Sequence, residues 1–202
     1  MGQRQKIAYN ILENLWDNKK ITCIYKHTSN KIYNRWPDEY DLGINFLYKR
    51  TIPTKELQKT RWINFNVGQL PQYGGNDTAY HAIIEESKEF GSSIYYMSPN
   101  PNEADIIESI NFSIKPSYTA KELINRSKDD LLLLFIKWIP TIISKNLIWT
   151  TTQKINYYPP SNINQQVLLT HEQKKKIRAI SDNTLQPVFD VNGTIYTIKK
   201  IK

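Results

Sequence analysis

Apolar residues recur at two different spacings along the chain, and each spacing predicts one kind of element. Over residues 4–18 they fall three or four positions apart, which predicts an amphipathic helix. The runs 42–49 and 61–68 are short and rich in β-branched and aromatic residues, so they predict two strands joined by a polar connection. Further strands are predicted over 92–97 and over the earlier run 21–25.

Capping residues mark two helices in the middle of the chain. The first is predicted over 77–90, with Asp77 or Asn76 as its N-cap and Gly91 as the C-terminal stop. The second is predicted over 102–114, with Asn102 as its cap. The central order is therefore strand, strand, helix, strand, helix, which indicates an α+β fold on a small sheet.

The last third of the chain combines a helix, an extended arm and a hairpin. Residues 120–139 are strongly helical in pattern and end at a proline, and the polar stretch 150–166 has the composition of a linker or arm. A capping box at Thr170 predicts another helix. Asn-Gly between alternating apolar residues predicts a β-hairpin over 188–198.

Composition and charge favour a polyanion as the partner. The net charge is +8, and residues 121–202 carry 13 Lys and Arg against 6 Asp and Glu. Charge that serves only solubility is the alternative explanation. A single cysteine, Cys23, excludes a disulfide scaffold and a zinc site of paired cysteines. The most apolar stretch, 131–149, is interrupted by Lys137, Pro140 and Lys145, so we expect no membrane span and a cytoplasmic protein.

One set of spacings resembles a known enzyme family. Glu108 is followed by Pro116 and Tyr118 at the offsets of the last conserved block of the GIY-YIG nucleases, and Gly43-Ile44-Asn45 and Asn66-Val67-Gly68 resemble its two strand motifs. The resemblance implies a core over 42–120 built on a small three-stranded antiparallel sheet with flanking helices. Residues 1–41 would then add a helix and strand arm, and residues 121–202 a basic region with a helix and a β-hairpin.

The resemblance also implies an activity. A DNA endonuclease of restriction or mobile-element type would hydrolyse phosphodiesters of double-stranded DNA with one Mg²⁺ or Mn²⁺ per active site, held by Glu108. The implied catalytic residues are Glu108, His81, Asn45, Asn66 and Tyr73. The candidate DNA-binding residues are Arg50, Arg61, Lys174, Lys175, Lys176, Arg178, Tyr157 and Tyr158. Paired cuts by so small an enzyme would suggest a homodimer.

The chain departs from the family at several places, which leaves the enzymatic activity open. The two strand tyrosines of the family fall on Asn45 and Asn66, whether native or engineered, and asparagine cannot act as a base near neutral pH. A different register would use Tyr25 and Tyr33 instead. Migrated groups could also supply the missing functions, from the set Tyr48, Tyr73, Arg50, Arg61 and His81. Two alternative functions are a catalytically degenerate DNA-binding module and a phage or viral protein that binds a host protein.

Overall fold

A five-stranded mixed sheet forms the centre of the protein. The structure is a computed structural model that describes residues 2–15, 38–48, 51–144, 150–160, 175, 178, 188–191 and 194–197. The strands follow the order β1-β2-β4-β5-β6, and their bounds are β1 (Gly43–Phe46), β2 (Trp62–Val67), β4 (Glu89–Met97), β5 (Glu103–Ser113) and β6 (Thr152–Lys154). The prediction of a small three-stranded antiparallel sheet is therefore wrong.

The first two strands of the sheet run parallel, and the other neighbours are antiparallel. Parallel strands need a crossover between them, and here the connection contains the short helix α2 (Thr54–Lys59). The carboxylate of Glu56 is buried in this crossover and accepts a hydrogen bond from Tyr40 Oη at 2.7 Å. The sequence predicted both strands correctly but only a polar link where α2 lies.

The segment 102–114 contains the strand β5 and not the predicted helix. The pairing of β5 with β4 shifts register between Ile94 and Tyr95, which marks a β-bulge or a similar irregularity. Such an irregularity offsets the apolar positions before and after it. Ile106, Ile107 and Ile110 then stand at spacings that also occur on a helix face, although β-branched residues favour a strand.

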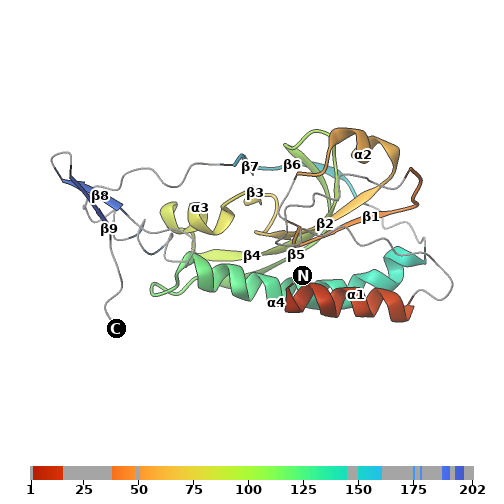
Figure 1. The fold of residues 1–202 in the computed structure, drawn as a ribbon, viewed down its shortest axis with the longest axis horizontal. Coiled ribbons are helices and arrows are strands. Elements are labelled where there is room, and N and C mark those ends of the chain that lie inside the picture. Colours follow the sequence, from red (N-terminus) through yellow and green to blue (C-terminus); the bar gives the residue numbers. More distant parts are fainter. Residues whose placement is uncertain are drawn as a thin grey trace.

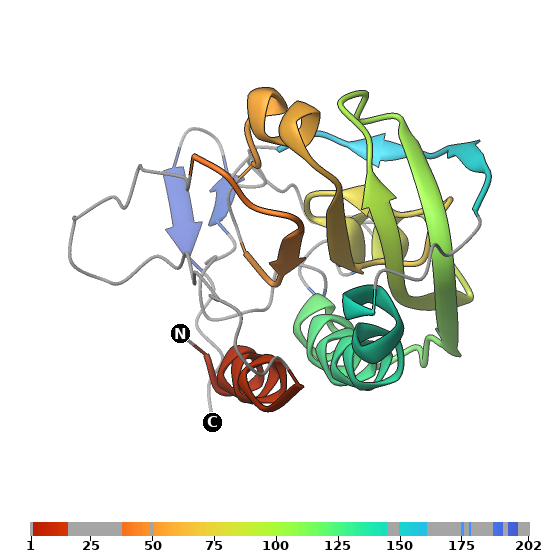
Figure 2. The same cartoon turned by 90° about the vertical axis from the view of Figure 1, so that its right-hand side faces the viewer.

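Two helices cover one face of the sheet. α4 (Ala120–Ile143) packs Leu131, Phe135 and Ile139 against the buried side chains of β2 and β4, and α1 (Gln3–Leu15) lies beside α4 (Figures 1 and 2). Thr119 and Glu122 form a capping box at the start of α4. The helix continues through Pro140 instead of ending there as predicted.

The chain that follows β2 packs beside β4, beyond the point where β2 ends. The two-residue strand β3 (Gly74–Gly75) pairs in parallel with β7 (Tyr157–Tyr158), and the helix α3 (Thr78–Ile84) comes next (Figure 1). α3 is shorter than the predicted helix over 77–90, because Glu86 takes a left-handed conformation and β4 already begins at Glu89. The polar arm thus contributes the short strands β6 and β7.

The C-terminal hairpin is confirmed. β8 (Val188–Val191) pairs antiparallel with β9 (Thr194–Thr197), and the predicted Asn-Gly turn between them lies outside the described residues. The predicted strand over 21–25 and most of the helix after Thr170 lie outside the described residues. In the described part of the chain, no helix has the length and apolar character needed to cross a bilayer. The division into segments 1–41, 42–120 and 121–202 stays a prediction.

Candidate functional site

The carboxyl ends of the parallel strands β1 and β2 form the candidate ligand site. In open α/β sheets, ligands bind in the crevice outside these strand ends, where the connecting loops leave room for them. At this edge the chain enters two loops, one after Phe46 and one after Val67. Leu47 opens the first loop in a left-handed conformation that is unusual for leucine, with φ at 56°.

Three asparagines and a tyrosine line the sheet face that is turned away from α4. Side chains alternate along a strand, so Ile63 and Phe65 point toward α4 while Asn64 and Asn66 share the other face. Asn45 is the direct neighbour of Asn64 across the strand pair. We call Asn45, Asn64, Asn66 and Tyr95 the amide face.

The contacts of the amide face leave some of its donors available. Asn64 donates through Nδ2 to Tyr95 Oη at 2.7 Å, and Asn45 accepts through Oδ1 from the backbone N–H of Tyr48 at 3.3 Å. Among the described residues, the Nδ2 group of Asn45 has no hydrogen-bond partner. Burial raises the pKa of Tyr95, so its hydroxyl stays protonated at neutral pH.

Asn66 acts on the loop that follows it. Its Nδ2 group donates to the carbonyl oxygens of Gly68 at 3.0 Å and Tyr73 at 2.9 Å. We call residues 68–73 the β2 loop. Gly68 has a φ of 131°, and a Cβ there would lie 2.3 Å from Tyr73 O, so this position accepts only glycine. The loop also contains a cis peptide bond between Leu70 and Pro71.

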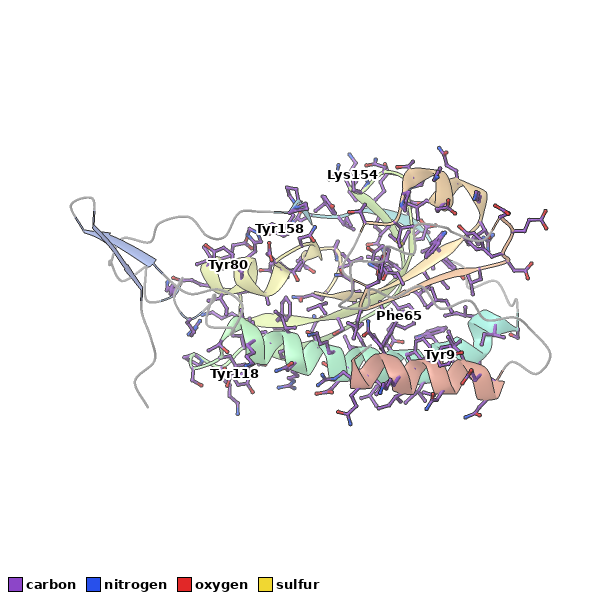
Figure 3. The ribbon with its side chains drawn as sticks, viewed as in Figure 1. Tyr9, Phe65, Tyr80, Tyr118, Lys154 and Tyr158 are labelled. Atoms are coloured by element: carbon purple, nitrogen blue, oxygen red, sulfur yellow. The ribbon has the colours of Figure 1, made fainter. Side chains whose placement is uncertain are left out.

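Tyr73, His81 and Tyr158 come together in an aromatic cluster beside α3. Tyr73 Oη and Tyr158 Oη lie 3.1 Å and 2.8 Å from the two carboxylate oxygens of Glu85, and the His81 ring stacks on Tyr158 at 4.1 Å. Figure 3 shows Tyr158 beside α3. Burial raises the pKa of both phenols and lowers that of His81. The cluster ties the arm that carries β7 to α3.

Glu108 lies on the other face of the sheet from Asn45 and Asn66. Its carboxylate accepts hydrogen bonds from Lys137 Nζ at 2.8 and 2.7 Å and from Trp138 Nε1 at 2.5 Å. Burial alone would raise the pKa of Glu108, but these α4 contacts outweigh it and lower the pKa. The structure thus places Glu108 in an ion pair between β5 and α4. The described residues contain no group of three or more His, Cys, Asp and Glu side chains placed to hold a metal ion.

The basic residues predicted to bind DNA do not gather around the amide face. Arg61 lies over the ring of Tyr96, Lys175 forms an ion pair with Glu86, and Arg178 donates to the carbonyl oxygen of Pro116. Tyr157 and Tyr158 are half-buried in β7. Arg50, Lys174 and Lys176 lie outside the described residues, as do Tyr25 and Tyr33.

Sequence reasoning named two members of the amide face and missed the other two. Asn45 and Asn66 entered through a motif comparison, whereas Asn64 and Tyr95 did not. A signal for Asn64 was present: asparagines alternate with Ile63, Phe65 and Val67 along β2, which places both amides on one face of a half-buried strand. Nothing in the sequence marked Tyr95, because its partner Asn64 is 31 residues away.

Comparisons with known proteins find similarity to formyltransferases. No family model matches the chain. Curated relatives include methionyl-tRNA formyltransferases of Mycoplasmopsis pulmonis, 26% identical over 71% of this chain, and of Halalkalibacterium halodurans, 29% identical over 54%. The matches cover 44% and 35% of those relatives, so the chain spans less than half their length.

Solved structures with a similar fold cover most of this chain. A 4-N formyltransferase from Francisella tularensis has a TM-score of 0.65 and 21% identity, covering 80% of this chain and 72% of its own. Protein Rv3404c of Mycobacterium tuberculosis has a TM-score of 0.72 and 15% identity, covering 99% and 94%. An N-formyltransferase of Helicobacter canadensis, solved with folinic acid and dTDP-3-aminofucose, has a TM-score of 0.61 and 23% identity, covering 74% and 58%.

These likenesses overturn the nuclease interpretation. The GIY-YIG resemblance was wrong, and the endonuclease prediction and both alternatives to it lose their support. Three of the similar structures were solved with a folate, which overturns the prediction of Mg²⁺ or Mn²⁺ as the cofactor, and nothing in these comparisons supports double-stranded DNA as a partner. The homodimer prediction loses its basis, since it rested on paired DNA cuts. The fold of the chain is that of the formyltransferases.

Proposed function

We propose that this protein binds a formylated tetrahydrofolate and transfers its formyl group to a primary amine. The observation that carries the proposal is the amide face, which lies at the ligand-binding edge of a sheet with the formyltransferase fold. The neighbours whose names state an acceptor use a nucleotide-linked amino sugar or methionyl-tRNA. Either acceptor offers an amine, and the proposal leaves the choice between them to experiment.

Neutral amides suit the charge changes of this reaction. The amine nitrogen attacks the formyl carbon, the formyl oxygen takes up negative charge, and the bond from that carbon to the folate nitrogen then breaks. The amine loses one proton and the folate nitrogen gains one. Fixed N–H donors near the developing oxyanion lower the barrier. In the proposal, Nδ2 of Asn45 and the second Nδ2 hydrogen of Asn64 are these donors, and Asn66 holds the β2 loop beside them.

The amide face supports a second candidate function, folate binding without transfer. Its side chains are amides and a phenol, and neither kind accepts a proton near neutral pH. The proton of the amine must then pass to solvent or to the folate nitrogen itself. If that transfer is too slow, the protein binds the ligand but does not turn it over.

The other catalytic residues predicted from the sequence have structural roles in this proposal. His81 and Tyr73 act within the aromatic cluster, and Glu108 acts in the ion pair with α4. The cytoplasmic location expected from the sequence stays a prediction.

The test combines binding with product analysis. Folinic acid is titrated into the full chain by calorimetry, and a formylated tetrahydrofolate is then incubated with dTDP-amino sugars or methionyl-tRNA, with mass spectrometry to detect an added formyl group. Asn45→Ala should weaken binding or transfer at least tenfold, whereas Asn111→Ala, an exposed asparagine on β5, should change neither. Binding without product supports the second candidate, and no binding of any formyl-folate contradicts both.

A further inference from the structure

Two serine hydroxyls lie beneath the β2 loop and fix its backbone. Ser93 on β4 accepts a hydrogen bond from the backbone N–H of Leu70 at 2.7 Å, and its Oγ lies 3.1 Å from the carbonyl oxygen of Gly68. Ser109 on β5 donates to the carbonyl oxygen of Leu70 at 3.1 Å. The two serines are partners across the strand pair, with their oxygens 2.8 Å apart.

These serines supply the backbone hydrogen bonds of the loop that a neighbouring strand would supply within a sheet. The loop has no strand partner at Leu70, yet Leu70 is buried, and buried backbone groups need hydrogen bonds. Both polar backbone groups of Leu70 obtain theirs from the serine pair. Further side chains hold the ends of the loop: Asn66 binds two of its carbonyl groups, and Thr78 Oγ1 donates to the carbonyl oxygen of Val67 at 2.5 Å.

We propose that Ser93 and Ser109 are positioning residues that preset the β2 loop for ligand binding. The inference rests on the proposed function, since the loop extends β2 past the amide face at the edge where the folate and the amine would bind. A loop that is already ordered loses little further freedom when it closes on a ligand, so affinity is retained. The serines themselves lie under the loop and act through it.

The chain provides a matched control in the preceding residue. Ser92 and Ser93 are adjacent on β4, and both are fully buried. The hydroxyl of Ser92 donates to the carbonyl oxygen of Ser127 on α4 at 2.9 Å, on the other face of the sheet. Ser92→Ala therefore removes one buried hydrogen bond of the same kind without touching the β2 loop.

The experiment measures loop order and ligand affinity separately in the full chain. Amide hydrogen exchange at Leu70, whose N–H donates to Ser93 Oγ, should accelerate about tenfold or more in Ser93→Ala and stay unchanged in Ser92→Ala. The affinity for folinic acid should fall about tenfold in Ser93→Ala and Ser109→Ala, which is about 1.4 kcal/mol. Ser109→Thr keeps the hydroxyl at a half-buried position and should retain the affinity.

The outcomes separate this inference from the proposed function. If Ser92→Ala weakens folinic acid binding as much as Ser93→Ala does, or if exchange at Leu70 does not respond to Ser93→Ala, the positioning role is refuted. If the unmodified protein binds no formyl-folate, the proposed function fails, and the role in ligand binding fails with it. The exchange rates then still decide whether the serines order the loop.

Discussion

At the scale of single residues, the surroundings decide what each polar side chain does. Asn66 uses its amide to hold two carbonyl groups of its own loop, whereas Asn45, also on the amide face, keeps its Nδ2 group available. Glu108 carries a charge that the sheet could not bury alone, and it is balanced by Lys137 on α4. A function inferred from residue type alone would have treated Asn45 and Asn66 alike.

The ion pair of Glu108 makes stability depend on pH. The pKa of Glu108 is lowered in the folded protein below its ordinary value of 4.5, because its hydrogen bonds to Lys137 and Trp138 outweigh burial. A lowered pKa contributes stability above pH 4.5, and this contribution is lost as the pH falls through the folded-state value. We expect Glu108→Gln to reduce the free energy of unfolding by about 1 kcal/mol at neutral pH.

Urea denaturation across the pH range checks this expectation. The difference between Glu108→Gln and the unmodified protein should shrink steadily below pH 4.5. Glu103→Gln is the control, since Glu103 lies on the same strand and its side chain makes no hydrogen bond or ion pair with the described residues. A pH-independent difference would show that the charge of Glu108 is not the cause.

At the scale of elements, β3 and β7 depend on a glycine. Gly75 has a φ of 92°, and a Cβ there would lie 2.3 Å from the carbonyl oxygen of Tyr158. Gly75→Ala should therefore lower the free energy of unfolding by about 1–3 kcal/mol and loosen the arm at β7. Faster limited proteolysis within residues 150–160 would report the loosening. Gly2→Ala, at an exposed glycine, should leave both the stability and the cleavage rate unchanged.

The start of α4 offers a second test at this scale. Thr119 accepts a hydrogen bond from the backbone N–H of Glu122, and the carboxylate of Glu122 accepts one from the backbone N–H of Thr119. Thr119→Ala should cost about 1 kcal/mol of unfolding free energy, and Thr119→Ser should cost little because it keeps the hydroxyl. Equal losses in both variants by thermal denaturation would mean that the cap does not stabilise α4.

Local patterns predicted the elements in which apolar residues are regularly spaced and whose structural partners lie nearby in the sequence. The helix α1, the strands β1, β2 and β4, and the C-terminal hairpin follow directly from such patterns. β5 was misread because its register shift creates a helix-like spacing of isoleucines. The parallel pairing of β1 with β2 depends on a crossover, which no single segment encodes. Only Asn45 and Asn66 of the amide face were predicted. The face as a whole could not be, because the pairing of β1 with β2 assembles it.

At the scale of the whole molecule, the reaction proposed here has a pH dependence that follows from the site. No side chain of the amide face accepts a proton near neutral pH, so the acceptor amine must lose its proton to solvent or to the leaving folate nitrogen. The rate of transfer should then rise with pH in a single step, as the amine itself becomes deprotonated. The midpoint of this step should belong to the acceptor and not to the protein.

Two acceptors whose amines differ in pKa show whether the midpoint belongs to the acceptor amine or to a residue of the protein. Rates measured under saturating conditions should give midpoints that shift with the pKa of the amine used. His81→Gln should leave the profile unchanged, because the pKa of His81 is lowered by burial and its ring is stacked on Tyr158, within the aromatic cluster. A bell-shaped profile, or a midpoint that stays fixed for both acceptors, would show that a residue of the protein takes the proton. The base would then have to lie outside the amide face.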